Sequence, residues 1–303
     1  MKNPILYALG VAVIVAILAP LTVNAAKPSR GSGFTITPDK PVGIDISFTD
    51  CTISSLPQNA SFAVVGVNGG KATNFNPCHA EQLTFAHSLT GNNTVTQVPK
   101  VQLYTNTGNP AYHVDHPSRK YPVVWPQSGE TPYGSCDGTT SRACVWQYGY
   151  EKSVATVEHF VTQAASVNVS SDPTQYRWWL DIETANSWLE TRKDADAYGK
   201  NIAAIEGYAA GIKSYGEQTY VGIYTNPNSW NVLTGNGSAV PATSPLRQLD
   251  TWRTATSFYS YESAKSTCTL GGYNGLNGNV VMTQFVSGID YDYSCATDMT
   301  LAS

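Results

Sequence analysis

Short apolar runs recur along the chain and predict β-strands. Most of these runs end in or near Gly, Asn, Pro or Thr, which commonly terminate strands. The predicted strands cover residues 42–48, 62–68, 101–105, 177–183, 220–225, 248–255 and 280–285.

Segments with helical periodicity lie between several of these strands. The clearest covers 194–215, where Ile202, Ile205, Tyr208 and Ile212 recur at steps of three or four and form one apolar face. We also predict helices over 79–89, 153–167 and, more briefly, 228–233, whereas no long helical period follows residue 241. This alternation predicts an α/β fold, a TIM-like irregular (β/α) barrel that is regular in its first half and strand-rich in its second.

The N-terminus has the pattern of a targeting segment. Lys2 precedes an apolar run over 5–21, and Val23 and Ala25 provide small residues three positions and one position before a cleavage point. Residues 1–25 therefore predict a secretory signal peptide, with an uncleaved membrane anchor as the alternative. We expect a leader or linker over 26–40 and one barrel domain over 41–303, with a disulfide-bearing insertion over 113–149.

Charge and cysteine content change this picture in two ways. The net charge is −4 and charged residues make up 13%, which argues against a nucleic-acid partner. The six cysteines all follow the predicted signal, and an even number in an exported chain predicts disulfides. Six cysteines allow 15 pairings, of which we favour the pairs between neighbouring segments: Cys51–Cys78, Cys136–Cys144 and Cys268–Cys295. A zinc site is the weaker alternative because the chain has no C-x-x-C pair.

Two carboxylates provide the strongest candidate chemistry. Asp181 and Glu183 lie in the run Trp178-Trp179-Leu180-Asp181-Ile182-Glu183, and positions i and i+2 of a strand share one face. The two acids should therefore point together into the barrel near the C-terminal end of a strand, where barrel enzymes place their chemistry. Crowding and burial raise the pKa of such acids, as a glycosidase proton donor requires. The alternative is a solvated loop or a calcium ligand.

Asp45 and Asp290 extend the acidic set. Asp45 alternates with Ile44 and Ile46 in the first strand, so its carboxylate should face inward. The alternative is a buried acid satisfied by backbone and hydroxyl donors. Because the first and last strands of a closed barrel are neighbours, Asp290 should lie close to Asp45. Asp292 is expected further on, toward the mouth or in a loop.

These motifs together resemble glycoside hydrolase family 25, the lysozymes or N-acetylmuramidases. The resemblance rests on Gly-Ile-Asp45-Ile-Ser, Leu-Asp181-Ile-Glu183, Val-Gly-Ile-Tyr224-Thr, Thr-Gln284-Phe and Ile-Asp290, in the family's order. It implies cleavage of the β-1,4 bond after N-acetylmuramic acid in peptidoglycan. Glu183 would be the general acid, Asp181 would orient and stabilise, and Asp45 and Asp290 would complete the acidic floor. No metal or cofactor is implied.

The sugar contacts are expected from four residues near strand ends: Tyr104, Tyr224, Trp252 and Gln284. Several segments depart from the family, including Val65-Gly66-Val67-Asn68-Gly69-Gly70, so the expected substrate is peptidoglycan or a related N-acetylhexosamine polymer. We expect a secreted or cell-wall-associated monomer with no membrane contact beyond an uncleaved anchor. The alternative function is a non-catalytic cell-wall glycan-binding barrel.

Overall fold

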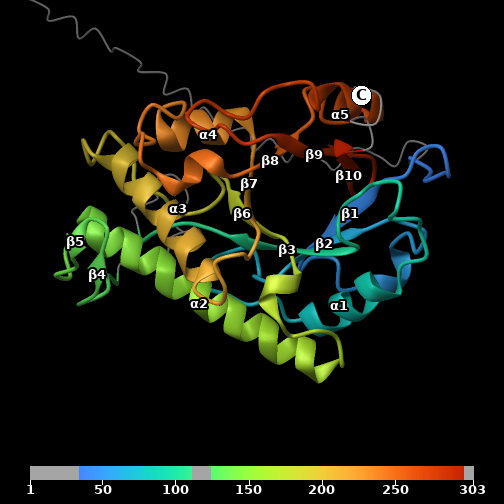
Figure 1. Ribbon diagram of the computed structural model, residues 1–303, viewed down its shortest axis with the longest axis horizontal. Coiled ribbons are helices and arrows are strands. Elements are labelled where there is room, and N and C mark those ends of the chain that lie inside the picture. The colour runs from blue at the N-terminus through green and yellow to red at the C-terminus, as the bar shows by residue number, and fades with distance from the viewer. Residues whose placement is uncertain (1–33, 111–123, 297–303) are drawn as a thin grey trace, which may run out of the picture. The chain divides into compact units, whose positions relative to one another are not determined.

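Eight strands form a closed barrel in the computed structural model, which describes residues 34–110 and 124–296 (Figure 1). Around the barrel the strand order is β1-β10-β9-β8-β7-β6-β3-β2. The strands are β1 (Gly43–Ile46), β2 (Ala63–Gly66), β3 (Val101–Asn106), β6 (Trp178–Ile182), β7 (Val221–Thr225), β8 (Thr251–Thr254), β9 (Val280–Val286) and β10 (Asp290–Ser294). All seven strands predicted from the apolar runs are present, and the predicted α/β barrel is confirmed at that level.

The barrel is mixed because its last strand runs against the others. The pairs from β1 through β2, β3, β6, β7 and β8 to β9 are parallel, whereas β10 is antiparallel to both β9 and β1. Only residues 287–289 connect β9 to β10, and Gly288 takes a positive φ of 84° there. A parallel neighbour would need a crossover of a dozen or more residues, so this short connection forces a hairpin.

The barrel interior is filled largely by aromatic side chains. A buried cluster inside the ring of strands includes Phe62, Trp179, Tyr224, Trp252 and Met282. Glycines on the same face make room for these rings, since a Cβ added at Gly222 would lie 2.3 Å from the Trp179 ring. The opposite faces of the strands pack in a larger outer cluster together with the helices.

Five α-helices are described: α1 (His79–Ser88), α2 (Arg142–Ser166), α3 (Ala197–Lys213), α4 (Pro227–Thr234) and α5 (Tyr261–Thr267). The 3₁₀ helices are η1 (Ile53–Ser55), η3 (Pro173–Gln175) and η4 (Pro245–Gln248). The helices α2 and α3 lie side by side beside the barrel, α1 packs on β2 and β3, and α5 packs on β9 and β10 (Figure 1).

The predicted start of the second helix was wrong. It begins at Arg142 rather than at 153, with the Ser141 side chain accepting a hydrogen bond from the Cys144 amide as its N-cap. The early turns bury small or polar residues, including Gly149 and Ser153, and they therefore lack a clear apolar period. Residues 142–149 consequently belong to α2 and not to the predicted insertion 113–149, which keeps a small hairpin of β4 (Glu130–Thr131) and β5 (Gly134–Ser135).

The compact unit begins at Phe34, so residues 34–40 belong to it although we assigned them to the linker. The Phe34 ring packs against Tyr261, Phe285 and Tyr291 at centroid distances of 5.1–5.3 Å. The predicted signal peptide 1–25 and residues 111–123 of the predicted insertion lie outside the described residues.

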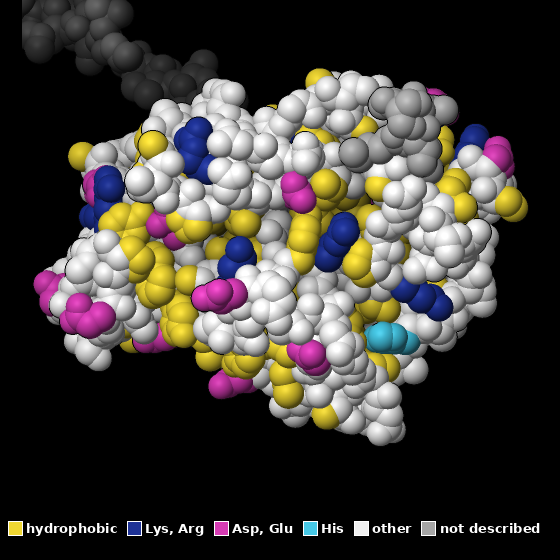
Figure 2. All heavy atoms as spheres, in the orientation of Figure 1, with side chains coloured by type: hydrophobic (Ala, Val, Ile, Leu, Met, Phe, Trp, Pro, Cys, Tyr) yellow, Lys and Arg dark blue, Asp and Glu magenta, His cyan; other side chains and the backbone are white. Residues whose placement is uncertain are grey.

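The three favoured disulfide pairings are confirmed: Cys51–Cys78, Cys136–Cys144 and Cys268–Cys295. The first joins the loop after β1 to the N-cap of α1, and the third joins the end of α5 to the residue after β10. On the face drawn in Figure 2, Lys, Arg, Asp and Glu side chains are scattered without a patch of one sign. Within the described ranges, no helix combines the length and apolar character needed to cross a membrane.

Candidate active site

The two acids of the D-x-E motif lie at the C-terminal end of β6 and face the barrel axis. Asp181 is 5% exposed, and Glu183, which directly follows the strand, is half-buried. Their strand neighbours Trp178, Leu180 and Ile182 point to the outer cluster and are fully buried. The alternation along β6 therefore separates acids from core as the sequence predicts.

Asp45 and Asp290 lie opposite each other on adjacent strands. Gly43 pairs with Asp292 and Ile44 with Tyr291, so the antiparallel register continues to Asp45 opposite Asp290. Both carboxylates are half-buried. Burial raises the pKa of Asp45 well above its usual value, and the charges of Asp290 and Glu183 act in the same direction. Acids from β1, β6 and β10 thus converge at one end of the barrel.

Two asparagines bind the β6 acids. Asn106, the last residue of β3, donates its side-chain N–H to Asp181 Oδ2. Asn226, the N-cap of α4, donates to Glu183 Oε1 at 3.3 Å. Asp181 Oδ1 has no hydrogen-bond partner among the described residues. The Trp188 indole N–H donates to the Glu183 carbonyl at 2.9 Å and fixes the backbone after β6.

A second hydrogen-bond chain holds Asp45. Gln284 Nε2 on β9 donates to Asp45 Oδ2 at 2.9 Å, and Tyr224 Oη on β7 donates to Gln284 Oε1 at 2.7 Å. Burial raises the pKa of Tyr224 well above its ordinary value, so its hydroxyl stays a donor at neutral pH. The amide of Gln284 can donate to Asp45 only because its carbonyl accepts from Tyr224, which fixes the amide orientation.

Burial dominates the electrostatics of the acids. It raises the pKa of Asp181 well above the usual value, and the neighbouring Glu183 adds to the effect, while the Asn106 hydrogen bond opposes it. Burial likewise raises the pKa of Glu183, against the hydrogen bond from Asn226. Among the described residues, no Lys or Arg forms an ion pair with Asp45, Asp181 or Glu183. Full ionisation of this crowded, buried set is therefore unfavourable, and the site tends to retain a carboxyl proton toward neutral pH.

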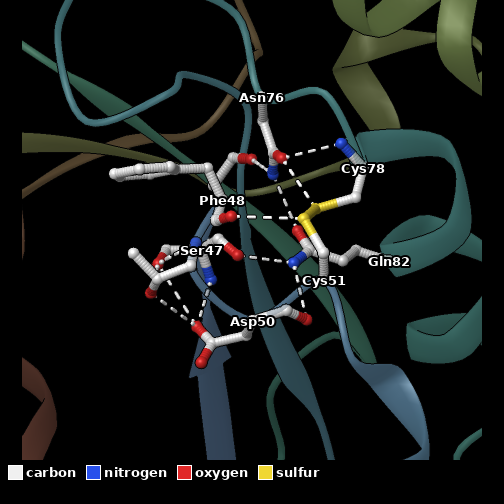
Figure 3. The surroundings of a disulfide bond; sticks show 9 residues. Ser47, Phe48, Asp50, Cys51, Asn76, Cys78 and Gln82 are labelled. Carbon is white, nitrogen blue, oxygen red and sulfur yellow. Dashed lines mark hydrogen bonds between the residues drawn. A yellow bond between two sulfur atoms is a disulfide. The ribbon is translucent and has the colours of Figure 1, made fainter.

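The loop after β1 is clamped beside Asp45. The disulfide Cys51–Cys78, the amide of Gln82 and the side chain of Asn76 surround residues 47–51 (Figure 3). Gln82 Nε2 donates to the Ser47 carbonyl at 2.5 Å, and the Asp50 carboxylate accepts from the Ser47 amide at 2.9 Å. This clamp fixes the strand end that carries Asp45, and the charge of Asp50 further raises the pKa of Asp45.

The four expected sugar contacts differ in their access. Tyr104 is half-buried, whereas Tyr224 is 8%, Gln284 5% and Trp252 2% exposed. Trp252 packs inside the barrel against the rings of Trp179 and Tyr224, at centroid distances of 5.9 and 4.3 Å. Gln284 therefore supports Asp45 through its hydrogen bond, and Trp252 fills the barrel interior. Tyr104 is the most exposed of the four side chains.

The expectation for Asp292 was wrong. Because β10 runs antiparallel to β1, residue 292 lies deeper in the barrel than residue 290, not nearer its mouth. The Asp292 side chain is fully buried, and neither carboxyl oxygen has a hydrogen-bond partner of ordinary geometry in the described part of the chain.

Sequence reasoning also missed Asn106 and Asn226, although a signal was available. Each follows an inward-facing tyrosine by two positions, Tyr104 before Asn106 and Tyr224 before Asn226. The same i, i+2 rule that selected Asp181 and Glu183 would have placed both amides on the inner face.

Comparison with models of known protein families and with curated proteins found no match for this chain. Among the described residues, no group of three or more His, Cys, Asp or Glu side chains is arranged to hold a metal ion.

Proposed function

We propose that this protein is a glycoside hydrolase of the family 25 type that cleaves β-1,4 bonds in peptidoglycan or a related N-acetylhexosamine polymer. The observation that carries the proposal is the convergence of Asp181 and Glu183 on β6 with Asp45 on β1 at the C-terminal end of the barrel. A hydrolase that breaks a glycosidic bond needs a carboxyl that holds a proton and a second that stabilises positive charge.

Glu183 is the proposed general acid. It is the half-buried member of the β6 pair, so it can reach a bound sugar, and burial raises its pKa toward the range of a neutral-pH proton donor. Its proton passes to the glycosidic oxygen as the bond from that oxygen to the sugar C1 breaks. The amide of Asn226 orients the carboxyl by binding Oε1.

Asp181 is the proposed stabilising carboxylate. Asn106 donates to one of its oxygens and fixes the carboxyl, which is 5% exposed beside Glu183 and would orient a donor from the substrate. In a substrate-assisted route that donor is the acetamido N–H of the sugar, whose carbonyl oxygen attacks C1 as the glycosidic bond breaks. Water then attacks C1 and breaks its bond to the acetamido oxygen, and Glu183 takes the proton from this water. The negative charges of Asp45 and Asp290 would stabilise the positive charge that develops on the sugar in an oxocarbenium-like transition state.

The proposal also covers the type of barrel and the export of the chain. We infer that the barrel is an irregular variant of the TIM-like (β/α) barrel, in which β8, β9 and β10 lack full crossover helices. We also infer export of the chain, since three disulfides form and persist in oxidising compartments.

The test compares wild type, Glu183→Gln and Glu158→Gln on purified cell walls and on chitin oligosaccharides, following the release of reducing ends. Loss of a general acid should lower kcat by about 10²–10⁴-fold. Glu158 is exposed on α2, so its variant should match wild type. Binding of walls by all three proteins without any release of reducing ends would instead support the non-catalytic glycan-binding barrel.

A further inference from the structure

A fully buried acid lies beneath the site and has no part in the proposed chemistry. Asp292 is 0% exposed, and its Oδ1 and Oδ2 both lack hydrogen-bond partners of ordinary geometry within the described residues. A bare carboxylate enclosed in this way would be very costly, because an ion loses its hydration without compensation. The position therefore needs either a proton on Asp292 or donors close to it.

Two groups around Asp292 are suited to a protonated carboxyl. The indole Nε1 of Trp252 on β8 is also buried without an ordinary partner, yet it lies close enough to lower the pKa of Asp292. On β1, Asp45 lies diagonally across the antiparallel pair and acts on Asp292 in the opposite direction. A neutral carboxyl offers one O–H donor and one carbonyl acceptor, which match Asp45 and Trp252 respectively.

The surroundings decide which of the two acids holds the proton. Burial raises the pKa of Asp45 too, but its half-buried carboxyl keeps more contact with water than that of Asp292. It also accepts a hydrogen bond from Gln284 Nε2 at 2.9 Å, which favours its ionised form. Asp292 has no contact with solvent. Because two adjacent buried carboxyls cannot both ionise, the proton belongs on the enclosed member.

We propose that Asp292 is a positioning residue that stays protonated at neutral pH, accepts the Trp252 N–H at its carbonyl oxygen and donates its O–H to the carboxylate of Asp45. One continuous chain then runs from Trp252 through Asp292, Asp45 and Gln284 to Tyr224. It fixes the orientation of the Asp45 carboxylate at the barrel mouth. The importance of that orientation for turnover rests on the proposed hydrolase function, whereas the location of the proton does not.

The other titratable groups near the pair act in the same direction. They come from five elements or their adjoining loops and are all acids or phenols: Asp290, Asp50, Asp181, Glu183, Tyr104 and Tyr224. Each additional negative charge makes ionisation of the Asp45–Asp292 pair harder, so the pair keeps one proton.

The test measures the proton directly in the full chain. Infrared difference spectra with ¹³C-labelled aspartate, recorded from pH 5 to pH 9, report the carbonyl stretch of any protonated Asp carboxyl. We expect such a band in wild type at pH 7, with a component that is lost in Asp292→Asn and kept in Asp39→Asn, where the carboxyl is exposed. Carboxyl NMR of the same samples should show the titration of Asp45 shifted in Asp292→Asn but not in Asp39→Asn.

The outcomes separate this inference from the proposed function. A wild-type protein without a protonated Asp band at pH 7, or a band of unchanged intensity and position in Asp292→Asn, overturns the location of the proton. An Asp45 titration that is unchanged in Asp292→Asn overturns the positioning role. Should Asp292→Asn fail to fold, Asp45→Asn should shift the wild-type band by removing the acceptor, and an unshifted band rejects the proposal. A protein that carries the band but releases no reducing ends from cell walls contradicts only the hydrolase function.

Discussion

Asp181 and Glu183 share one strand and one face, but their environments differ. Asp181 is almost enclosed and binds an amide of β3, whereas Glu183 is half-buried and binds an amide at the start of α4 at 3.3 Å. A pair of acids can divide the roles of donor and stabiliser only if their surroundings differ in this way. The asparagines therefore matter as much to the proposed roles as the acids do.

At the residue scale, Asn106→Ala should move the pH profile of hydrolysis. A hydrogen bond to a charged group contributes about 1.5–3 kcal/mol, and its loss should raise the pKa of Asp181 further. In the proposed mechanism Asp181 acts in its ionised form, so the acidic limb of the kcat/KM profile should shift to higher pH. The control is Asn231→Ala, exposed on α4. If the acidic limb of the Asn106→Ala profile stays at the wild-type pH, the Asn106 amide does not lower the pKa of Asp181.

At the element scale, the spacing of apolar residues and the lengths of the loops explain most of the strands and helices. The Ile-rich face of α3 and the apolar strands were predictable because each buries a regular stripe. The early part of α2 was not, since it packs on α3 through small residues such as Gly149, where an added Cβ would lie 2.3 Å from the Ala204 carbonyl. Such an interface gains stability from close approach, which leaves little hydrophobic signal in the sequence.

The disulfide between the β1 loop and α1 should stabilise the fold measurably. Cys51 and Cys78 are 27 residues apart, and cross-linking a loop of this length restricts the unfolded chain by about 3–4 kcal/mol. Cys51→Ser/Cys78→Ser should therefore lower the free energy of unfolding in urea by that amount. Cys136→Ser/Cys144→Ser is the matched comparison, because its separation of 8 predicts a loss about 1 kcal/mol smaller. An equal or reversed order would contradict the loop-entropy explanation.

At the scale of the whole molecule, the barrel is a packed core with a polar end rather than an open channel. Aromatic rings occupy its interior beneath the acids, and glycines on neighbouring strands leave the space for them. This apolar filling is what desolvates the carboxyls, because water cannot approach them from below. Stability and acid chemistry therefore depend on the same packing.

Gly222→Ala tests that packing. The added Cβ would lie 2.3 Å from the Trp179 ring in the barrel interior, and overpacking of this kind costs about 1–3 kcal/mol. We expect a corresponding fall in the free energy of unfolding. Gly271→Ala is the control, since nothing lies within 4 Å of its added Cβ. Equal stability of the two variants would mean that the interior can rearrange around the extra methyl group.

The sequence alone favoured the observed disulfide pairing, because each pair joins neighbouring segments. It also determined seven of the eight barrel strands, three of the helices and the inward direction of the acids Asp45, Asp181, Glu183 and Asp290. These features follow from local periodicity and from the alternation of faces in a strand, both of which can be counted along the chain. The asparagines that bind the β6 acids obeyed the same alternation and could have been found.

Only the tertiary structure decided the depth of each side chain and the direction of the last strand. The sequence predicts that Trp252 contacts a sugar. Its side chain is enclosed instead, because β8 places it between the rings of Trp179 and Tyr224 in the barrel. Asp292 is buried rather than exposed because the hairpin after β9 reverses β10. Burial and strand direction depend on contacts between segments far apart in the chain, and these contacts set the protonation of the acids.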